Sequence, residues 1–331
     1  MKKKKSIFLT AMLSLSMVLS ACNSDSANSD EKDSGSAGGN DDGQKYVAII
    51  SKGFQHQFWQ AVKKGAEQAA DEMDVKITFE GPESESQVDK QVEMLRAVLD
   101  KKPDALGFAA LDSQASVPLL QEAADKKIPI IAFDSGVESD LPLATAATDS
   151  RAAAALAADK MAEHIGGKGK VAVVAHDQVS QTGIQRRDGF VDKIKKDYPD
   201  IEIVDIQYGG GDHLKSTDAA KAIMQAHPDL AGIFGTNEGS AIGVVNAVSE
   251  LNKKDLVVIG FDSGKQQIDA IKNGSMTGAI TQNPIGIGYE TVKAAVAAIN
   301  GEKVEKNIDT GFFWYDKENI DDKEIKAVLY E

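Results

Sequence analysis

The chain has 331 residues, of which 42% are hydrophobic and 27% are charged, so it is long enough for two globular domains with cores of ordinary size. Its 51 Asp and Glu residues outnumber its 37 Lys and Arg residues, which gives a formal net charge of −14. Because so acidic a surface repels phosphate backbones, we expect no nucleic-acid partner.

The first 21 residues are predicted to be a signal peptide. Lys2 to Lys5 form a positive segment, and an apolar stretch follows from Ile7 to Leu19, which is too short to span a bilayer stably. Small residues then precede Cys22 in the sequence Leu-Ser-Ala-Cys. This arrangement resembles the bacterial lipoprotein signal, in which that cysteine is lipidated. The alternative is an ordinary secretory signal with an incidental cysteine.

A flexible linker is expected from residue 22 to residue 44. This stretch is made of Ser, Asp, Asn, Gly and similar residues and contains no large apolar side chain, so it cannot bury enough surface to fold. Cys22 is the only cysteine, which excludes a disulfide within the chain. We therefore expect an exported protein that is lipid-anchored to the outer face of the cytoplasmic membrane, with folded structure from about Lys45.

From Lys45 onward, apolar strand patterns alternate with helical patterns, which is typical of an α/β protein with parallel sheets. The two halves of the chain repeat this architecture, so the sequence predicts two doubly wound, Rossmann-like domains. Gly166 to Gly169 and Gly209 to Gly211 lack the spacing of a phosphate-binding loop, so helix ends and turns are the better interpretation. Strands are expected at 46–51, 75–79, 105–109, 129–133, 143–148, 170–175, 201–206, 230–235, 256–261 and 276–281, and helices at 58–73, 88–99, 117–125, 151–165, 183–197, 216–226, 239–251, 264–273 and 284–300.

Two of the predicted strands end in the same four residues. Phe133-Asp134-Ser135-Gly136 and Phe261-Asp262-Ser263-Gly264 each follow an apolar run that suits a strand buried on both faces. In open α/β sheets, ligands bind at the carboxyl ends of the strands. The repeat therefore predicts one ligand crevice between two domains, with one Asp contributed from each side.

The sequence does not favour an enzyme. Asp134 and Asp262 could act as acid and base, but no nucleophile with its base is evident, and carboxylates followed by Ser-Gly suit hydrogen-bond acceptance better. The five histidines show no i, i+4 pair and have no accompanying cysteine, so a zinc site is not expected. We expect no cofactor and no metal.

Phe58 and Trp59 stand at the start of a predicted helix, on the edge where the ligand is expected. One of the two is expected in the core, and the other could stack on the C–H groups of a sugar ring. Carboxylates, an arginine and amides from other strand ends would pair the hydroxyl groups of a polyhydroxylated ligand in such a cleft.

From about Lys45 to the end, the chain resembles the ribose- and galactose-binding class of ABC-transporter substrate-binding proteins, whose fold the ligand domains of LacI-type repressors share. The resemblance rests on motifs that occur in the family's order. They are Phe58-Trp59, Phe133-Asp134, Thr148-Asp149, Arg186-Arg187-Asp188-Gly189-Phe190, Ala226-His227-Pro228-Asp229, Thr236-Asn237-Glu238, Gly260-Phe261-Asp262 and Gln282.

The resemblance implies the type 1 periplasmic-binding-protein fold, with a three-crossover hinge near Thr148-Asp149, Gln282-Asn283 and Thr310-Gly311. It implies an N-terminal subdomain of residues 45–148 plus 283–310 and a C-terminal subdomain of residues 149–282 plus 311–331. It also implies a ligand site in which the aromatic pair stacks on the sugar, Asp134 accepts from two hydroxyls and Arg186 donates in a bidentate manner. The expected ligand-binding residues are Lys52, His56, Phe58, Trp59, Asp134, Ser135, Arg186, Asn237, Asp262 and Gln282.

Some positions depart from the pattern of ribose-binding relatives. Lys52 replaces a small hydroxyl residue, His56 and Ala109 replace asparagines, Ser135 replaces an arginine and Gly211 replaces an aromatic residue. Ribose itself is therefore not the expected ligand; another monosaccharide, a polyol or a sugar acid paired with Lys52 fits better. Lys52 could also be an exposed residue at a strand end, and Arg186 a surface residue of a charged helix.

The function that the sequence predicts is capture of a monosaccharide or polyol between two closing domains and its delivery to the permease subunits of an ABC importer. The protein is expected to act as a monomer. The alternative is a receptor that presents its ligand to a membrane sensor kinase or chemoreceptor. A LacI-type regulator is disfavoured, because an export signal stands where a DNA-binding motif would be required.

Overall fold

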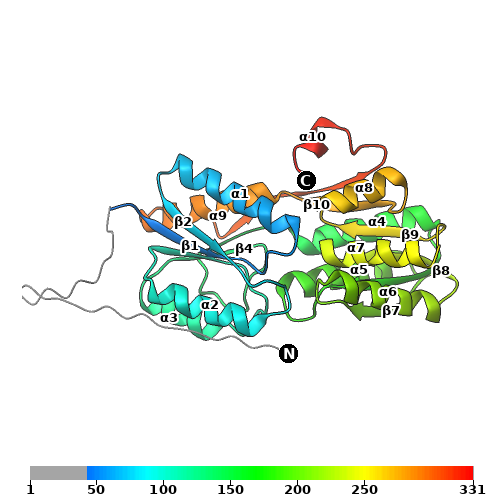
Figure 1. Cartoon of the computed structure of the whole chain (residues 1–331), viewed down its shortest axis with the longest axis horizontal. Coiled ribbons are helices and arrows are strands. Elements are labelled where there is room, and N and C mark those ends of the chain that lie inside the picture. Colours follow the sequence, from blue (N-terminus) through cyan, green and yellow to red (C-terminus); the bar gives the residue numbers. More distant parts are fainter. Residues whose placement is uncertain (1–42, 331) are drawn as a thin grey trace, which may run out of the picture. The chain divides into compact units, whose positions relative to one another are not determined.

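The computed structural model describes residues 43–330. The predicted signal peptide, Cys22 and the linker up to residue 42 lie outside the described residues, as does residue 331. Two six-stranded sheets organise the described part, and helices cover both faces of each sheet (Figure 1). This is the predicted type 1 periplasmic-binding-protein fold.

The first sheet has the strand order β11-β5-β4-β3-β1-β2, and all of its strand pairs are parallel. Its strands are short and apolar, and β1, β3 and β4 are almost wholly buried, as expected of strands covered on both faces. The strands are β1 (Tyr46–Ile50), β2 (Lys76–Glu80), β3 (Ala105–Phe108), β4 (Ile130–Phe133), β5 (Ala144–Ala147) and β11 (Asn307–Asp309).

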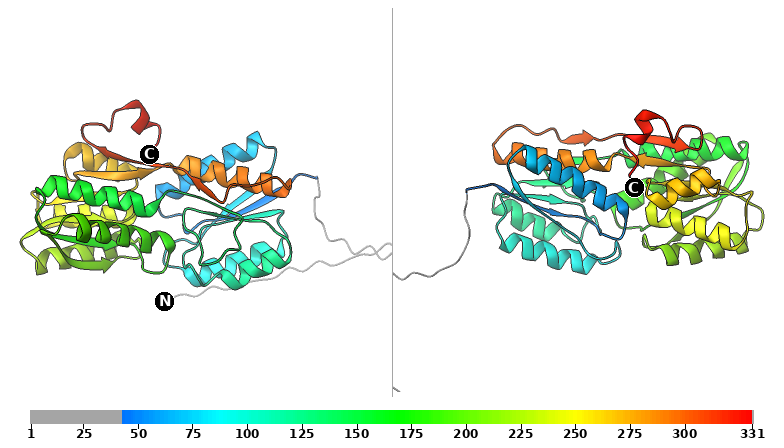
Figure 2. Two further views of the ribbon diagram at one scale, coloured as in Figure 1. Left: turned by 180° about the vertical axis from the view of Figure 1, so that it is seen from behind. Right: turned by 45° about the horizontal axis from the view of Figure 1, so that its top comes forward.

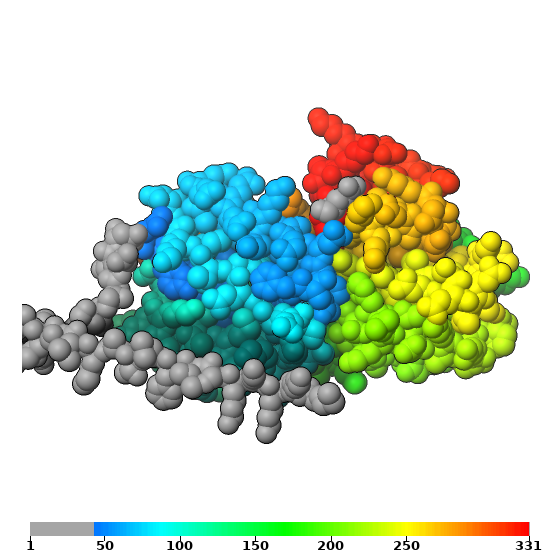
Figure 3. Space-filling model, in the orientation of Figure 1, coloured from blue at the N-terminus to red at the C-terminus, as the bar shows by residue number. Residues whose placement is uncertain are grey.

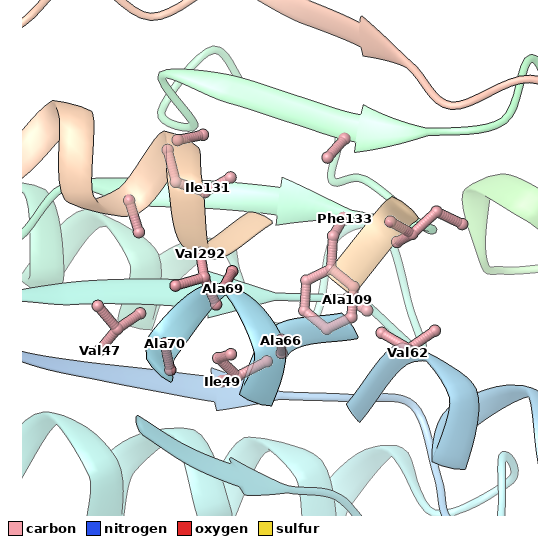
Figure 4. Close-up of a cluster of buried hydrophobic side chains, with 14 of the residues drawn as sticks. Val47, Ile49, Val62, Ala66, Ala69, Ala70, Ala109, Ile131, Phe133 and Val292 are labelled. Atoms are coloured by element: carbon pink, nitrogen blue, oxygen red, sulfur yellow. The ribbon is translucent and has the colours of Figure 1, made fainter. Parts of the chain in front are cut away.

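Four helices cover this sheet, and together with it they form the first lobe. On one face α1 (Gln57–Glu72) lies against α9 (Pro284–Ile299), as the views in Figure 2 show. Phe133 and Ile131 of the sheet pack with Val62 and Ala66 of α1 in a shared apolar cluster (Figure 4). The opposite face is covered by α2 (Val88–Asp100) and α3 (Val117–Asp125).

The second sheet has the order β12-β10-β9-β8-β6-β7, and only the β10–β12 pair is antiparallel. Helices α4 and α5 cover one face, and α6, α7 and α8 cover the other, which completes the second lobe. Its elements are α4 (Ser150–Ile165), β6 (Gly169–Ala175), α5 (Gln181–Asp197), β7 (Ile201–Tyr208), α6 (His213–Ala226), β8 (Leu230–Gly235), α7 (Glu238–Glu250), β9 (Val257–Phe261), α8 (Lys265–Asn273), β10 (Gly278–Gln282), β12 (Phe312–Asp316) and α10 (Lys323–Lys326).

The chain passes between the two sheets three times. The crossings contain Thr148-Asp149 between β5 and α4, Asn283 between β10 and α9, and Thr310-Gly311 between β11 and β12. Each crossing is short, and Thr148 Oγ1 donates a hydrogen bond of 3.1 Å to the carbonyl of Gly311, so two of them are joined directly.

Two strands near the C-terminus were not predicted from the sequence. The last predicted strand is 276–281, but β11 and β12 follow it and complete one sheet each. The two glycine clusters serve as helix ends and turns, as expected: Gly166 closes α4 in the left-handed conformation, with φ of 75°, and Gly210 and Gly211 also have positive φ in the turn before α6.

Candidate functional site

The carboxyl ends of the strands in both lobes face one pocket. Its lining comes from the ends of β1, β4, β6, β8, β9 and β10, from α1 and α5, and from the loop after β2. The lining side chains are all buried and enclose a small space. The lining residues are Lys52, His56, Phe58, Trp59, Glu85, Asp134, His176, Arg186, Asn237, Asp262 and Gln282.

The two repeated strand ends have the same backbone geometry. Asp134 has φ of 53° and Asp262 has φ of 80°, a region that residues other than glycine seldom adopt. The amide of each Asp donates to a carbonyl of the next strand, Asp134 to Ala146 at 3.0 Å and Asp262 to Ile280 at 2.7 Å. This shared turn directs both carboxylates into the pocket, one from each lobe, as the sequence predicts.

Arg186 reaches the pocket from α5 and lies between the two carboxylates. Its guanidinium is 3.9 Å from Asp134 and 3.9 Å from Asp262, and its Nη1 donates to the carbonyl of Thr236 at 3.1 Å. The group also lies 3.8 Å from the centroid of the Phe261 ring, a cation–π contact. Arg186 is 3% exposed, so the alternative of a surface residue is wrong.

Lys52 is also buried, at 3% exposure, which overturns the alternative of an exposed lysine at a strand end. Its Nζ donates to Thr182 Oγ1 at 2.9 Å and lies 3.8 Å from Asp134. Burial raises the pKa of Asp134 above its usual range, although Lys52 and Arg186 act to lower it. The Lys52 ammonium is therefore already engaged by Asp134 and Thr182.

Phe58 and Trp59 both line the pocket and both belong to the core of the first lobe. Their rings meet edge to face, with centroids 4.9 Å apart. Trp59 Nε1 donates to Glu85 Oε1 at 2.7 Å, which fixes the orientation of the indole. The expectation that only one of the two aromatic residues is part of the core is wrong, because both belong to the core and both line the pocket.

Asn237, Gln282 and His56 complete the set of predicted residues that line the pocket. Gln282 donates to Asp262 at 2.7 Å, and Asn237 Nδ2 donates to Glu85 Oε2 at 3.1 Å. His56 is 2% exposed and its Nδ1 has no partner among the described residues. Ser135, the remaining predicted residue, is buried but does not line the pocket.

Two lining residues, Glu85 and His176, were not predicted from the sequence. His176 directly follows the buried strand β6, the same signal that identified Asp134, but it was considered only as a zinc ligand. Burial lowers the pKa of His176 to about 3, so the imidazole is neutral at physiological pH. Glu85 lies in an irregular loop beside the exposed Glu83, and nothing in the sequence separates the two.

The position of Gly211 is next to Glu85. A β-carbon placed on Gly211 would be 3.0 Å from Glu85 Oε2 and 3.1 Å from Asn237 Nδ2. A side chain at residue 211 would therefore require the carboxylate of Glu85 to shift. The absence of a side chain at residue 211 makes room for the carboxylate of Glu85.

The lobes are joined over the pocket by polar contacts. Gln55 Nε2 donates to the Gly211 carbonyl at 3.0 Å. The carboxylate of Glu238, in the second lobe, accepts from the amides of Gln57 and Phe58 at 3.0 and 3.1 Å. In the space-filling view the two lobes touch along this face (Figure 3). The lining side chains are consequently almost inaccessible to solvent.

Among the described residues, no group of His, Cys, Asp and Glu side chains is placed to hold a metal ion. Residues 43–330 also contain no helix with the length and apolar character needed to cross a membrane.

The profile of the periplasmic binding protein domain matches residues 47–303. The D-allose-binding periplasmic protein of Escherichia coli is 28% identical over 78% of this chain and 85% of that protein, and the ribose import binding protein of Bacillus subtilis is 26% identical over 79% and 84%. An ABC-transporter solute-binding protein from Agrobacterium vitis, solved with bound D-fucose, is 36% identical with a TM-score of 0.84, over 86% of this chain and all of that one.

The chain therefore belongs to the periplasmic binding protein family. Within it, the chain is an extracytoplasmic substrate-binding protein of an ABC sugar importer.

Proposed function

We propose that the pocket holds one monosaccharide or polyol, contacted by both lobes, which the chain delivers to the permease of its ABC importer. The observation that carries this proposal is the convergence of three carboxylates, two cations and two aromatic rings on one small, buried space. Carboxylates accept hydrogen bonds from sugar hydroxyls, a guanidinium donates to hydroxyl and ring oxygens, and aromatic faces suit the C–H face of a sugar. We propose that the sugar contacts the residues that line this pocket.

In the proposed mechanism, the ligand stabilises the closed arrangement of the lobes. The limits we propose are residues 45–148 with 283–310 for one lobe and residues 149–282 with 311–331 for the other. The three short crossings support a hinge, because few backbone segments need to bend. A ligand held by Asp134 on one side and Asp262 on the other binds the closed form better and so shifts the population toward it.

We also propose that the mature protein begins at a lipidated Cys22, acts as a monomer and is anchored to the outer face of the cytoplasmic membrane. The support is the sequence Leu-Ser-Ala-Cys at residues 19–22 after an apolar stretch, followed by a polar linker. Replacement of Cys22 by serine should release the protein from the membrane fraction; an unchanged membrane-bound fraction would contradict the anchor.

The experiment that tests the proposed function is a thermal-shift screen of residues 45–331 against pentoses, hexoses, polyols and their acids. A ligand that binds only the folded protein adds RT ln(1 + [L]/Kd) to its stability, about 4 kcal/mol at a thousandfold excess over Kd. We therefore expect at least one neutral sugar or polyol to raise the melting temperature by several degrees. A panel in which nothing raises it would contradict the proposal.

A further inference from the structure

Glu85 is a carboxylate of the pocket that lies apart from the two carboxylates at the strand ends. It is 8% exposed, and its oxygens accept hydrogen bonds from Trp59 Nε1 and Asn237 Nδ2, both neutral donors. Its one ion-pair contact among the described residues is with His56, whose Nε2 is 3.9 Å from Oε2. Burial acts to raise the pKa of Glu85, but the ammonium of Lys52 and the hydrogen bond from Trp59 help to bring this pKa below its ordinary value.

The two cations of the pocket serve the other carboxylates. Lys52 lies 3.8 Å from Asp134, and Arg186 lies 3.9 Å from both Asp134 and Asp262. Apart from its two histidines, the lining thus carries three carboxyl groups and two cationic side chains, so the acidic groups outnumber the basic ones by one. Two further acidic residues near the pocket, Glu238 and Asp177, accept hydrogen bonds from backbone amides and do not offset the acidic groups of the lining.

This charge balance decides which ligands the pocket can take. A sugar acid would bring a fourth carboxylate into a space where all lining side chains are nearly inaccessible to water, and buried like charges are strongly unfavourable. Lys52 could not pair with the new carboxylate without leaving Asp134 less compensated. An uncharged sugar adds no charge and offers hydroxyl donors to all three carboxylates.

We propose that Glu85 is a specificity-determining residue that makes this pocket take uncharged monosaccharides and reject sugar acids. The proposal rests on the proposed function, since it concerns the same pocket. It excludes the sugar acid that the sequence left open as a ligand of Lys52. It also gives a reason for the glycine at residue 211, which leaves space for the carboxylate.

The test is calorimetric titration at pH 7 with pairs of sugars that share ring stereochemistry: D-galactose with D-galacturonate, D-glucose with D-glucuronate and D-mannose with D-mannuronate. In the pair whose neutral member binds best, we expect the acid to bind at least about 100-fold more weakly. Glu85→Gln keeps the size of the side chain and removes the charge, so it should reduce that ratio about tenfold or more. Glu83→Gln, an exposed carboxylate of the same loop, is the matched control and should leave the ratio unchanged.

Two results would overturn the inference while leaving the proposed function intact: wild-type protein that binds a uronate as tightly as its neutral partner, or a ratio that Glu85→Gln does not alter. Binding of a uronate with no binding of any neutral sugar would also overturn it. If no member of these pairs and no compound of the thermal-shift panel binds, the proposed function itself fails, and the inference fails with it.

Discussion

Replacing Arg186 with methionine is expected to weaken sugar binding by at least about 100-fold. Among the described residues, Arg186 is the only cationic side chain that forms ion pairs with both Asp134 and Asp262, and it is 3% exposed. Arg186 and Asp134 lie in different lobes, so removing the guanidinium weakens the arrangement that the closed, sugar-bound form requires. Truncating one partner of a buried charge pair across an interface costs about 2–5 kcal/mol, and about 2.8 kcal/mol corresponds to 100-fold in affinity. Calorimetric titration with the sugar identified by the thermal-shift screen measures the loss.

Arg187→Met is the matched control for this variant. Arg187 adjoins Arg186 on α5, but its side chain bonds to Asp188 at 2.6 Å and to the Tyr208 hydroxyl at 3.1 Å and does not line the pocket. We expect its affinity to stay within about twofold of wild type, since surface ion pairs contribute little. If Arg186→Met folded, as judged by circular dichroism, and bound the sugar as tightly as the control, the role assigned to Arg186 would be wrong.

Glu238→Ala is expected to lower the affinity about 30-fold without removing any residue that lines the pocket. In the structure, Glu238 of α7 accepts hydrogen bonds from the first amides of α1 in the other lobe, whereas the residue before α1, His56, makes no side-chain cap. A hydrogen bond typically contributes about 1 kcal/mol net, so the two bonds together contribute about 2 kcal/mol. When the lobes separate, water can accept from the amides of Gln57 and Phe58, but in the closed form the alanine variant leaves these amides without their acceptor. The variant should therefore destabilise the closed form by about 2 kcal/mol.

The dissociation rate of the sugar, followed by stopped-flow mixing, distinguishes this effect from general destabilisation. We expect Glu238→Ala to dissociate faster with little change in association rate, because only the closed complex makes these contacts. Glu250→Ala is the control at the other end of α7, where the exposed carboxylate contacts Lys221. Equal dissociation rates for wild type and Glu238→Ala would show that Glu238 does not hold the lobes together.

The parts of the site that could be predicted from the sequence are those with a local signal. An apolar strand that stops at Asp134 or Asp262 shows both the element and the group at its end, and the structure directs both carboxylates into the pocket. Arg186 stands in the middle of a charged helix, where composition favours the surface as much as the pocket. Only its place in a family motif indicated a role in ligand binding.

The missed features depend on tertiary contacts that the sequence does not display. Glu85 and Glu83 have the same local composition, and only the packing of Glu85 against Trp59 and Asn237 makes it a pocket residue. Strand β11 has three residues, Asn307–Asp309, and is defined by its pairing with β5. By contrast, the aromatic run of β12 has clear strand propensity and could have been predicted.

The most direct test of sugar binding in this pocket is the fluorescence of Trp59. The chain has two tryptophans, and the other, Trp314 on β12, bonds to Asp316 and does not line the pocket. In a Trp314→Phe variant, we expect the sugar found by the thermal-shift screen to change the Trp59 emission in a saturable way, with one site per chain and the affinity measured by calorimetry. A sugar that stabilised this variant while leaving Trp59 emission unchanged would place the binding site elsewhere.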